Sequence, residues 1–531
     1  MPRLTILVQG KPHVLSFRPG ASLREILDRS DYRVRSACLG HGACGLCQVR
    51  LLSGEGGPHQ PAEQFQLSAS DLTEGKRLAC QMRPTTDLTV EILNPPPPSG
   101  WRTPPEGLTY APAGFAADRP PPPGVSHPVG AAVDLGTTHL SIAVHSLASG
   151  RRLAERWGKN PQGRFGSDVV TRLMAAQRPE VAEAQAFAAR HAIGEAIADV
   201  ARREGLDCHA FSRVTVVGNT AMLALLADRN HHLLLQPAYW MAPLECTTID
   251  GAAWAQAWGI ARQAQIELVP PLGGFVGSDL IAGLVACRLT EGSAPALFID
   301  FGTNSEIALW TGSDLWVTAT AGGPAFESGA GSCGTPAEAG AVFRVAETAD
   351  GGLAFRVLDD DCAHGLCGSG LVDLVACLRR RQRLDAKGRF AEGAKNFAFA
   401  VGEREFSLGL RDIDALQRAK AAVGAGIAAL SAVAGLPLAA LQRVVVAGLF
   451  GRYLDIANAQ AIGLLPSVPV SRIELVGNTA AAGATALLLS TQAQAMANRL
   501  RQQAQLINLA HRPEFEDAFL EHLYLRPTEA S

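Results

Sequence analysis

A short repeat constrains the fold of this chain more than any other feature. The pattern Asp-Xaa-Gly-Thr occurs twice, at residues 134–137 and 300–303, with 166 residues between corresponding positions. Each copy follows an apolar run typical of a buried strand, and a second strand-like run follows each turn, at residues 140–144 and 306–310. An internal repeat of this kind predicts two similar α/β lobes that face each other across a cleft.

The rest of the chain after residue 129 fits the same architecture. Strand–glycine turn–helix units are predicted at residues 214–219, 444–448 and 473–478, and alanine-rich helices at 179–203 and 413–434. The string Val-Gly-Asn-Thr-Ala also occurs twice, at residues 217–221 and 476–480. These patterns predict one two-lobed α/β domain. Its expected parts are a first lobe at about 129–290, a second lobe at about 291–512 and a C-terminal tail at 513–531, which together make up residues 129–531.

The first 93 residues are predicted to form a separate domain, residues 1–93. Strands are expected at residues 4–8, 13–17, 48–52 and 88–93, with a short helix at 22–28. Residues 94–128 then differ in composition, because twelve of these thirty-five residues are proline. Such a segment cannot build a core and is expected to be a semi-rigid spacer. Extended at about 3.1 Å per residue, it would reach on the order of 100 Å and let the first domain swing.

Four cysteines in the first domain predict an iron–sulfur site. Cys38, Cys44 and Cys47 have the spacing Cys-x5-Cys-x2-Cys, and Cys80 follows after thirty-two residues. Four thiolates suffice for a [2Fe–2S] cluster, and the three glycines between the first and third cysteines let the backbone wrap it closely. Structural zinc more often takes two Cys-x2-Cys pairs, whereas this segment has one. Cys362 and Cys367 flank another glycine-rich turn, and there we expect thiols of the core or a loop.

The two repeated turns predict a site for nucleotide phosphates. Small turn residues bring backbone N–H donors and hydroxyls close to phosphate oxygens. The expected contacts are Gly136, Thr137 and Thr138 from the first lobe and Gly302, Thr303 and Asn304 from the second. Asp134 and Asp300 end the two strands, where a carboxylate would hold Mg²⁺ through water or orient the attacking water. Gly448 and Gly451 would line the adenosine side, with Lys420 nearby, and the chain has no P-loop motif.

Composition restricts the class of protein. A chain of 531 residues with 47% hydrophobic and 18% charged residues is ordinary for a globular protein of several domains. The net charge of −3 and the lack of a long basic run give no reason to expect nucleic acid. No apolar stretch approaches the roughly 18 residues of a membrane span, and no signal peptide is recognisable. Eleven cysteines then indicate a reducing compartment, so a cytoplasmic location is expected.

Six longer strings carry a family resemblance. They are Gly-Asn-Thr-Ala-Met at 218–222, Gly-Phe-Val-Gly-Ser-Asp at 274–279, Gly-Pro-Ala-Phe-Glu at 323–327, Cys-Gly-Ser-Gly-Leu-Val-Asp at 367–373, Ala-Gly-Leu-Phe-Gly-Arg-Tyr-Leu-Asp-Ile at 447–456 and Arg-Pro-Glu-Phe at 512–515. Residues 129 to about 512 resemble the actin/sugar-kinase/Hsp70 ATPase superfamily and, more narrowly, the reductive activators of corrinoid proteins. The implied fold is an α+β ferredoxin-type [2Fe–2S] domain followed by a two-lobed α/β ATPase domain. No separate middle domain is apparent between the two.

The resemblance implies an ATP-dependent activator that returns an inactive Co(II) corrinoid methyltransferase protein to Co(I) by one-electron transfer. It implies a [2Fe–2S] cluster, ATP and Mg²⁺ as cofactors. The implied partners are a corrinoid protein of a methyltransferase system and an upstream electron donor, without nucleic acid or membrane, and a homodimer stays open. The alternatives are an ATP-binding electron carrier, a small-molecule kinase-like protein with an accessory ferredoxin domain, and an ATP-regulated scaffold.

Overall fold

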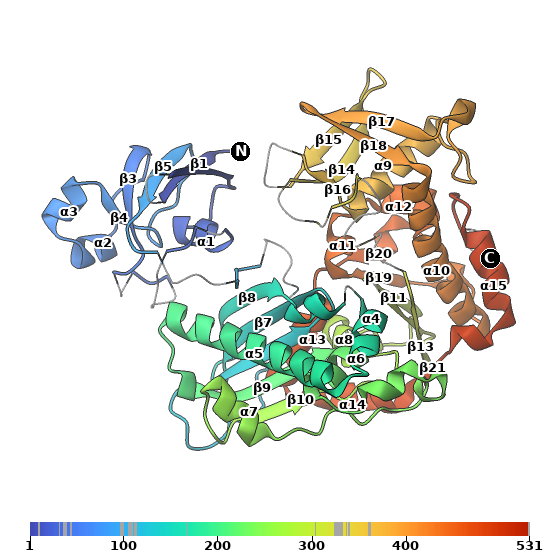
Figure 1. The fold of residues 1–531 in the computed structure, drawn as a ribbon, viewed down its shortest axis with the longest axis horizontal. Coiled ribbons are helices and arrows are strands. Elements are labelled where there is room, and N and C mark those ends of the chain that lie inside the picture. Colours follow the sequence, from blue (N-terminus) through green and yellow to red (C-terminus); the bar gives the residue numbers. More distant parts are fainter. Residues whose placement is uncertain are drawn as a thin grey trace.

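The structure of the protein, a computed structural model, has a small N-terminal domain and two larger lobes (Figure 1). It describes residues 1–8, 11–30, 32–34, 40–42, 45–95, 100–104, 110, 114–166, 168–302, 304–322, 326, 333–335, 337, 340–358 and 363–528, apart from the side chain of residue 449. Within these ranges, no helix combines the length and the apolar composition needed to cross a bilayer.

The N-terminal domain is a five-stranded sheet with three short helices. Its elements are β1 (Arg3–Val8), β2 (Lys11–Ser16), α1 (Leu23–Asp28), β3 (Gln48–Gly54), α2 (Pro61–Gln66), α3 (Ala69–Thr73), β4 (Lys76–Leu78) and β5 (Leu88–Ile92), in the sheet order β2-β1-β5-β3-β4. Ser22 caps α1 because its side chain accepts from the Glu25 N–H while the Glu25 carboxylate accepts from the Ser22 N–H at 2.6 Å. The four predicted strands and the helix are confirmed, whereas α2, α3 and β4 were not predicted.

The first lobe is a five-stranded sheet covered by helices. Its elements are β6 (Val129–Leu135), β7 (His139–Ser146), β8 (Arg152–Lys159), α4 (Val169–Ala175), α5 (Pro179–Glu204), β9 (Phe211–Gly218), α6 (Thr220–Ala227), α7 (Gly251–Trp258) and β10 (Gln265–Leu268), in the sheet order β10-β9-β6-β7-β8. The predicted alanine-rich helix α5 packs on β7 and β8. It ends at Gly205, whose φ of 66° lies in the left-handed region that favours glycine.

The second lobe repeats this plan and adds two small sheets. Its elements are α8 (Ser278–Cys287), β11 (Ala296–Asp300), β12 (Ser305–Trp310), β13 (Leu315–Thr320), β14 (Ala341–Glu347), β15 (Leu353–Val357), β16 (Gly365–Leu366), α9 (Gly368–Arg380), β17 (Asn396–Val401), β18 (Arg404–Gly409), α10 (Leu410–Ala434), β19 (Arg443–Ala447), α11 (Gly448–Tyr453), α12 (Ile456–Ala461), β20 (Ile473–Leu475), α13 (Thr479–Leu489), α14 (Thr491–Gln503), β21 (Ala504–Leu506) and α15 (Pro513–His522). The order β20-β19-β11-β12-β13 matches that of the first lobe, so the predicted pair of similar lobes is confirmed.

Helices α8 and α13 cross between the lobes and pack against each other at the centre of the molecule (Figure 1). Helix α8 joins β10 of the first lobe to β11 of the second, and α13 follows β20 but packs on β6 and β9. A Cβ atom on Gly483 of α13 would lie 1.9 Å from the carbonyl oxygen of Ala282 on α8. The two helices therefore approach backbone to backbone, which fixes how the lobes face each other.

The proline-rich spacer is attached to the two lobes at several points. The backbones of Arg102 and Trp157 exchange two hydrogen bonds, of 2.9 and 2.7 Å, so that the spacer extends the sheet beside β8. Further along, Asp118 accepts hydrogen bonds from Thr491, and Arg119 pairs with Glu267. The spacer thus differs from the free, swinging tether that its composition predicts, because its non-proline residues make specific contacts.

The close contact of α8 with α13 predicts that Gly483→Ala destabilises the protein. The added methyl group overlaps Ala282, and only a separation of the two helices relieves the overlap, so we expect a loss of about 1–3 kcal/mol. Thermal unfolding measures the effect. Gly251→Ala on α7 is the matched control, because a Cβ there meets no atom within 4 Å. An equal change in both variants would contradict the role of the helix crossing.

Candidate nucleotide and iron–sulfur sites

A cleft between the lobes brings together residues from both repeated turns. The lining includes the predicted residues Asp134, Gly136, Thr137, Thr138, Asp300, Gly302, Asn304 and Gly448. The cleft has a volume of about 150 Å³, which suits a phosphate and metal end better than a whole nucleotide. Thr303 lies outside the described residues. Gly451 is not part of the lining, since it lies on α11 where a Cβ would be 3.0 Å from the Val446 carbonyl oxygen.

Several helices begin at this cleft. Asn219 and Asn478 line it as the N-caps of α6 and α13, and Asp279 lines it from the first turn of α8. Free N–H groups and the helix dipole make such ends favourable for anions. Ser278 holds two of the ends together, because its hydroxyl accepts a hydrogen bond from the Gly218 N–H at 3.2 Å. The arrangement offers phosphate groups several donors from a rigid scaffold.

Four carboxylates line the cleft, namely Asp134, Asp279, Asp300 and Glu306. Burial raises the pKa of Asp134 to about 6, although its hydrogen bonds with Asn478 and Ser141 act in the opposite direction. The pKa of Asp279 is also raised, first by burial and further by the negative charge of Asp134. Carboxylate oxygens at this density form the donor set that Mg²⁺ prefers, and a bound cation would lower the pKa of both groups.

The asparagines of the repeated Val-Gly-Asn-Thr-Ala string are cleft residues that the sequence analysis did not assign. Asn478 accepts from the Ala481 N–H at 2.9 Å and donates from Nδ2 to Asp134 Oδ2 at 2.7 Å. Asn219 accepts from the Ala221 N–H at 3.0 Å. Each thus caps a helix while its side chain faces the cleft. The repetition of the string was the signal that could have identified them, although Asn219 follows β9 and Asn478 follows β20, which are not corresponding strands of the two sheets.

Gly448 is the position in the cleft where glycine is required. Its φ is +88°, in the left-handed region, and a Cβ would lie 2.8 Å from Asp300 Oδ1. The turn after β19 therefore passes directly against the carboxylate of the second repeat. Lys420, which we expected near the adenosine, is not among the residues that line this cleft. It is buried on α10, and its Nζ donates to the carbonyl oxygen of His522 in the last turn of α15.

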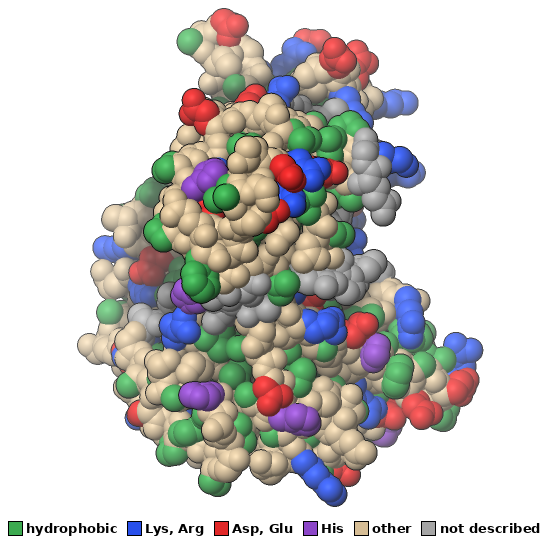
Figure 2. Space-filling view, turned by 90° about the vertical axis from the view of Figure 1, so that its left-hand side faces the viewer, with side chains coloured by type: hydrophobic (Ala, Val, Ile, Leu, Met, Phe, Trp, Pro, Cys, Tyr) green, Lys and Arg blue, Asp and Glu red, His purple; other side chains and the backbone are tan. Residues whose placement is uncertain are grey.

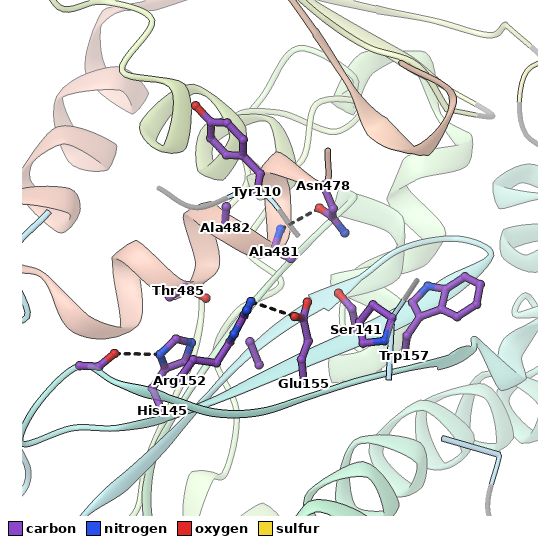
Figure 3. A pocket seen from close by; sticks show the side chains of 13 residues that line it. Tyr110, Ser141, His145, Arg152, Glu155, Trp157, Asn478, Ala481, Ala482 and Thr485 are labelled. Carbon is purple, nitrogen blue, oxygen red and sulfur yellow. Dashed lines mark hydrogen bonds and ion pairs between the residues drawn. The ribbon is translucent and has the colours of Figure 1, made fainter. Parts of the chain in front are cut away.

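His139 and Trp157 form a wall of the cleft. Their rings stack with centroids 4.2 Å apart. Trp157 also borders a second cavity of about 280 Å³, shown in Figure 3, which shares Ser141 and Asn478 with the cleft. The spacer contributes Pro104 and Tyr110 to this cavity. The spacer therefore comes close to the nucleotide cleft.

The iron–sulfur loop is described in part. Cys38 and Cys44 lie outside the described residues, whereas Cys47 and Cys80 are buried, with 1% and 6% of their surfaces exposed. A hydrogen bond with Cys47 lowers the pKa of the Cys80 thiol to about 6, and Gln81 donates to its sulfur at 3.3 Å. A depressed pKa favours the thiolate, which is the form that ligates metal. Among the described residues alone, no group of three or more potential metal ligands occurs.

The glycines of this loop fit a backbone that wraps a cluster. Gly40, Gly42 and Gly45 all have positive φ, of 85°, 78° and 64°. A Cβ on Gly42 would lie 2.6 Å from the side chain of Ala62, so the loop is pressed against α2. Only glycine adopts this path without strain. The thiols and the loop together fit a [2Fe–2S] cluster.

Comparison with known proteins agrees with this geometry. Residues 6–85 match the model of the 2Fe-2S iron-sulfur cluster binding domain, residues 129–292 the RACo middle region, and residues 294–531 the C-terminal domain of RACo, the ASKHA domain. The corrinoid activation enzyme RamQ of Eubacterium limosum is 30% identical over 417 residues, which are 74% of this chain and 69% of that protein. The Na(+)-translocating NADH-quinone reductase of Pseudoalteromonas atlantica has a component that is 37% identical over 90 residues, 17% of this chain and 22% of that component.

A solved structure of a reductive activator for a corrinoid, iron-sulfur protein has the same fold. Its TM-score is 0.67 at 24% sequence identity, and the match covers 100% of this chain and 99% of that one. Fold and sites thus define a protein that joins a [2Fe–2S] domain to a domain of the actin, sugar-kinase and Hsp70 class. The chain belongs to the family of reductive activators of corrinoid proteins.

The family models correct one expectation about the domains. No middle domain was apparent in the sequence, yet the middle region of the family matches residues 129–292. This stretch comprises the first lobe, from β6 to β10, together with the connecting helix α8. The middle region escaped detection because its sheet repeats the plan of the second lobe and its strands were assigned to the ATPase.

The buried thiols predict which cysteines hold iron. Cys80→Ser should lose most of the visible absorption and bound iron after anaerobic reconstitution, because the cluster would lose a ligand. Cys208→Ser is the control, since Cys208 is a partly exposed thiol of the first lobe, between α5 and β9. Iron analysis and the absorption spectrum measure both. Full iron content in the Cys80 variant would show that this thiol is not a ligand.

The raised pKa of Asp134 predicts a pH-dependent stability. The ordinary value is 3.8 and the folded value about 6, so folding opposes ionisation and stability falls as pH rises from about 4 to about 6. Two pKa units correspond to at most about 3 kcal/mol. Asp134→Asn, without nucleotide or metal, should therefore unfold at higher temperature than the wild type at pH 7.5, with little difference near pH 4. Asp517→Asn, at an exposed position of α15, should leave the unfolding temperature unchanged both at pH 7.5 and near pH 4.

Proposed function

We propose that this protein is an ATP-dependent reductive activator of a corrinoid methyltransferase protein, which it returns from Co(II) to Co(I). The proposal is supported above all by the union of a [2Fe–2S] domain and an ASKHA cleft in one chain, aligned over 74% of its length with a corrinoid activation enzyme. The cluster, when bound, supplies one electron at a time. An upstream donor would reduce it again after each transfer.

Nucleotide binding would offset the unfavourable free energy of electron transfer from the cluster to cobalt. Plant-type [2Fe–2S] centres have potentials near −400 mV, and a Co(II)/Co(I) couple can lie lower. Since 59 mV is a factor of ten for one electron, a gap of roughly 100 mV is an unfavourable factor of about fifty. Lobes that bind the Co(II) partner more tightly than the Co(I) product offset this factor through differential binding.

The residues of the cleft would act on the phosphates and a Mg²⁺ ion. Gly136, Gly302 and the helix N-termini offer N–H donors to the phosphate oxygens. Asp134 and Asp300 would hold Mg²⁺ or orient the attacking water, and Asn478 fixes the orientation of the Asp134 carboxylate. Hydrolysis would remove the γ-phosphate between the lobes, and lobe opening about α8 and α13 would then release the partner.

The role of the nucleotide predicts the behaviour of Asp300→Ala. The variant should keep the cluster spectrum but lose at least tenfold of the ATP-dependent rate of Co(I) formation, because a carboxylate at the phosphates is removed. The measurement is the anaerobic absorption change of a Co(II) corrinoid protein mixed with reduced activator and ATP. Asp314→Ala, an exposed position in the turn between β12 and β13, serves as control.

The same assay separates the alternatives. An electron carrier that only binds ATP would reduce the cobalt equally well with and without nucleotide. A small-molecule kinase would consume ATP without any dependence on the redox state of the cluster. Either result would contradict the proposed function.

A further inference from the structure

A cluster of seven charged side chains lies where the N-terminal domain meets the first lobe. The N-terminal domain contributes Arg24, Asp28 and Arg33, and the first lobe contributes Arg156, Asp199, Arg203 and Glu204. None of these side chains is more than 8% exposed. Charges on the face seen in Figure 2 are instead interspersed on the open surface. We call this cluster the interdomain charge network.

One half of the network joins α1 to the end of α5. Arg24 Nη2 lies 2.7 Å from Glu204 Oε1, and Arg24 Nε lies 3.2 Å from Asp28 Oδ2. Arg203 donates to Asp28 in turn. The Asp28 backbone is engaged as well, because its carbonyl oxygen accepts from the Thr103 N–H at 3.2 Å. Domain, spacer and lobe therefore meet at one helix end.

The other half joins the residue Arg33 to β8 and α5. Arg33 Nη2 lies 3.4 Å from Asp199 Oδ1, and Arg156 Nε donates to Asp199 Oδ2 at 2.8 Å. Arg156 also donates from Nη2 to Glu204 Oε1 at 3.0 Å, which connects the two halves. Each carboxylate of the lobe is thus shared between an arginine of its own lobe and an arginine of the N-terminal domain.

The network specifies an orientation more than it adds stability. Removing seven charges from water is unfavourable, and the attraction between them only partly offsets this loss. The four arginines also outnumber the three carboxylates. Burial and the charge of Arg24 accordingly lower the pKa of Arg203 to about 10. An interface of this kind has one well-defined geometry and can still dissociate.

Arg24 connects the network to the iron–sulfur loop. Its backbone N–H donates to the Ala79 carbonyl oxygen at 3.0 Å, next to Cys80. Its guanidinium lies 3.4 Å from the position of a Cβ on Gly40. The Arg24 guanidinium therefore lies beside the cluster loop and at the same time pairs with Glu204.

We propose that the interdomain charge network is a docking site that holds the N-terminal domain in one orientation on the first lobe. Within it, Arg24 and Glu204 are positioning residues through which docking lowers the reduction potential of the cluster. Reduction adds a negative charge, which an uncompensated cation and water favour. Docking adds the Glu204 carboxylate directly to Arg24 and buries the loop side of α1, while the two arginines and two carboxylates of the lobe together add no net charge. The docked domain is then the stronger reductant, whatever protein accepts the electron.

The spacer limits how far the domain moves from this site. Asn94 is tied to the N-terminal domain, because its Nδ2 donates to the Leu46 carbonyl oxygen at 3.0 Å. Arg102 is tied to Trp157 of β8, so about seven residues separate the two attachments. At about 3.1 Å per residue they span about 20 Å. A longer excursion requires the backbone pairing of Arg102 with Trp157 to open.

Glu204→Arg in the full-length protein with its cluster tests the proposal. The substitution places a cation beside Arg24, so the domain should leave the lobe and the radius of gyration in small-angle X-ray scattering should increase. The midpoint potential, measured by EPR-monitored titration, should rise so that the ratio of reduced to oxidised cluster changes about tenfold at fixed potential, which is 59 mV. Glu195→Arg, an exposed position on the same helix, is the matched control.

A double variant distinguishes the loss of docking from misfolding of the first lobe. Arg24→Glu combined with Glu204→Arg exchanges the two charges and should return the scattering towards that of the wild type. An unchanged radius and an unchanged potential in Glu204→Arg would overturn the docking site. A larger radius with an unchanged potential would support docking and overturn the effect of Arg24 on the cluster. Equal changes in the Glu195 control would overturn both.

Discussion

Helices α8 and α13 pack closely enough to set how the two lobes are arranged. At Gly483 and Ala282 the two helices touch backbone to backbone, and each helix belongs by sequence to one lobe and by packing partly to the other. Side chains from both lobes, among them Val217 and Val445, share the apolar core around the pair. The turns of the two repeats face each other because both lobes pack on this pair of helices.

The cleft between the lobes has an excess of negative charge when no cation is bound. Burial raises the pKa of both Asp134 and Asp279, and the negative charge of Asp134 raises that of Asp279 further. Helix N-termini and Asn478 compensate part of this charge but supply no full positive charge. A phosphate group alone would add to the repulsion, whereas a metal–phosphate complex relieves it. Within the proposed function, this charge distribution supports a nucleotide that binds together with a metal ion.

The N-terminal domain uses charge for a different purpose. At its interface with the first lobe the charges are buried and paired across the two domains, which gives orientation, while the net stabilisation is small. The spacer adds a second attachment at Arg102 and Trp157. Electron transfer to a partner requires a cluster that is held in a defined place but can be released, and two weak, separable attachments meet that requirement.

The sequence determined the elements that depend on local chemistry. The repeated turns predicted two similar lobes and a shared cleft, and the cysteine spacing predicted the iron–sulfur domain, because turn geometry and ligand spacing are properties of a few neighbouring residues. The strands around Leu4 and Val133 and the long helix α5 were predicted for the same reason. Short elements such as α2 and β4 were missed because their residues carry no periodic pattern.

Which distant residues meet depends on how the chain folds as a whole. Asn478 reaches Asp134 over 344 residues of chain, and Arg24 reaches Glu204 over 180, so neither pair has a local signature. The spacer was predicted to be free because proline content sets the stiffness of a chain, whereas the backbone pairing of Arg102 depends on the exposed edge of β8. Lys420 was expected near the adenosine, but it is buried where α10 packs against α15 and its Nζ donates to the His522 carbonyl oxygen. Turns and ligand spacings depend on adjacent residues and can be recognised in the sequence. The contacts that place one domain against another join residues far apart in the chain and have no such pattern.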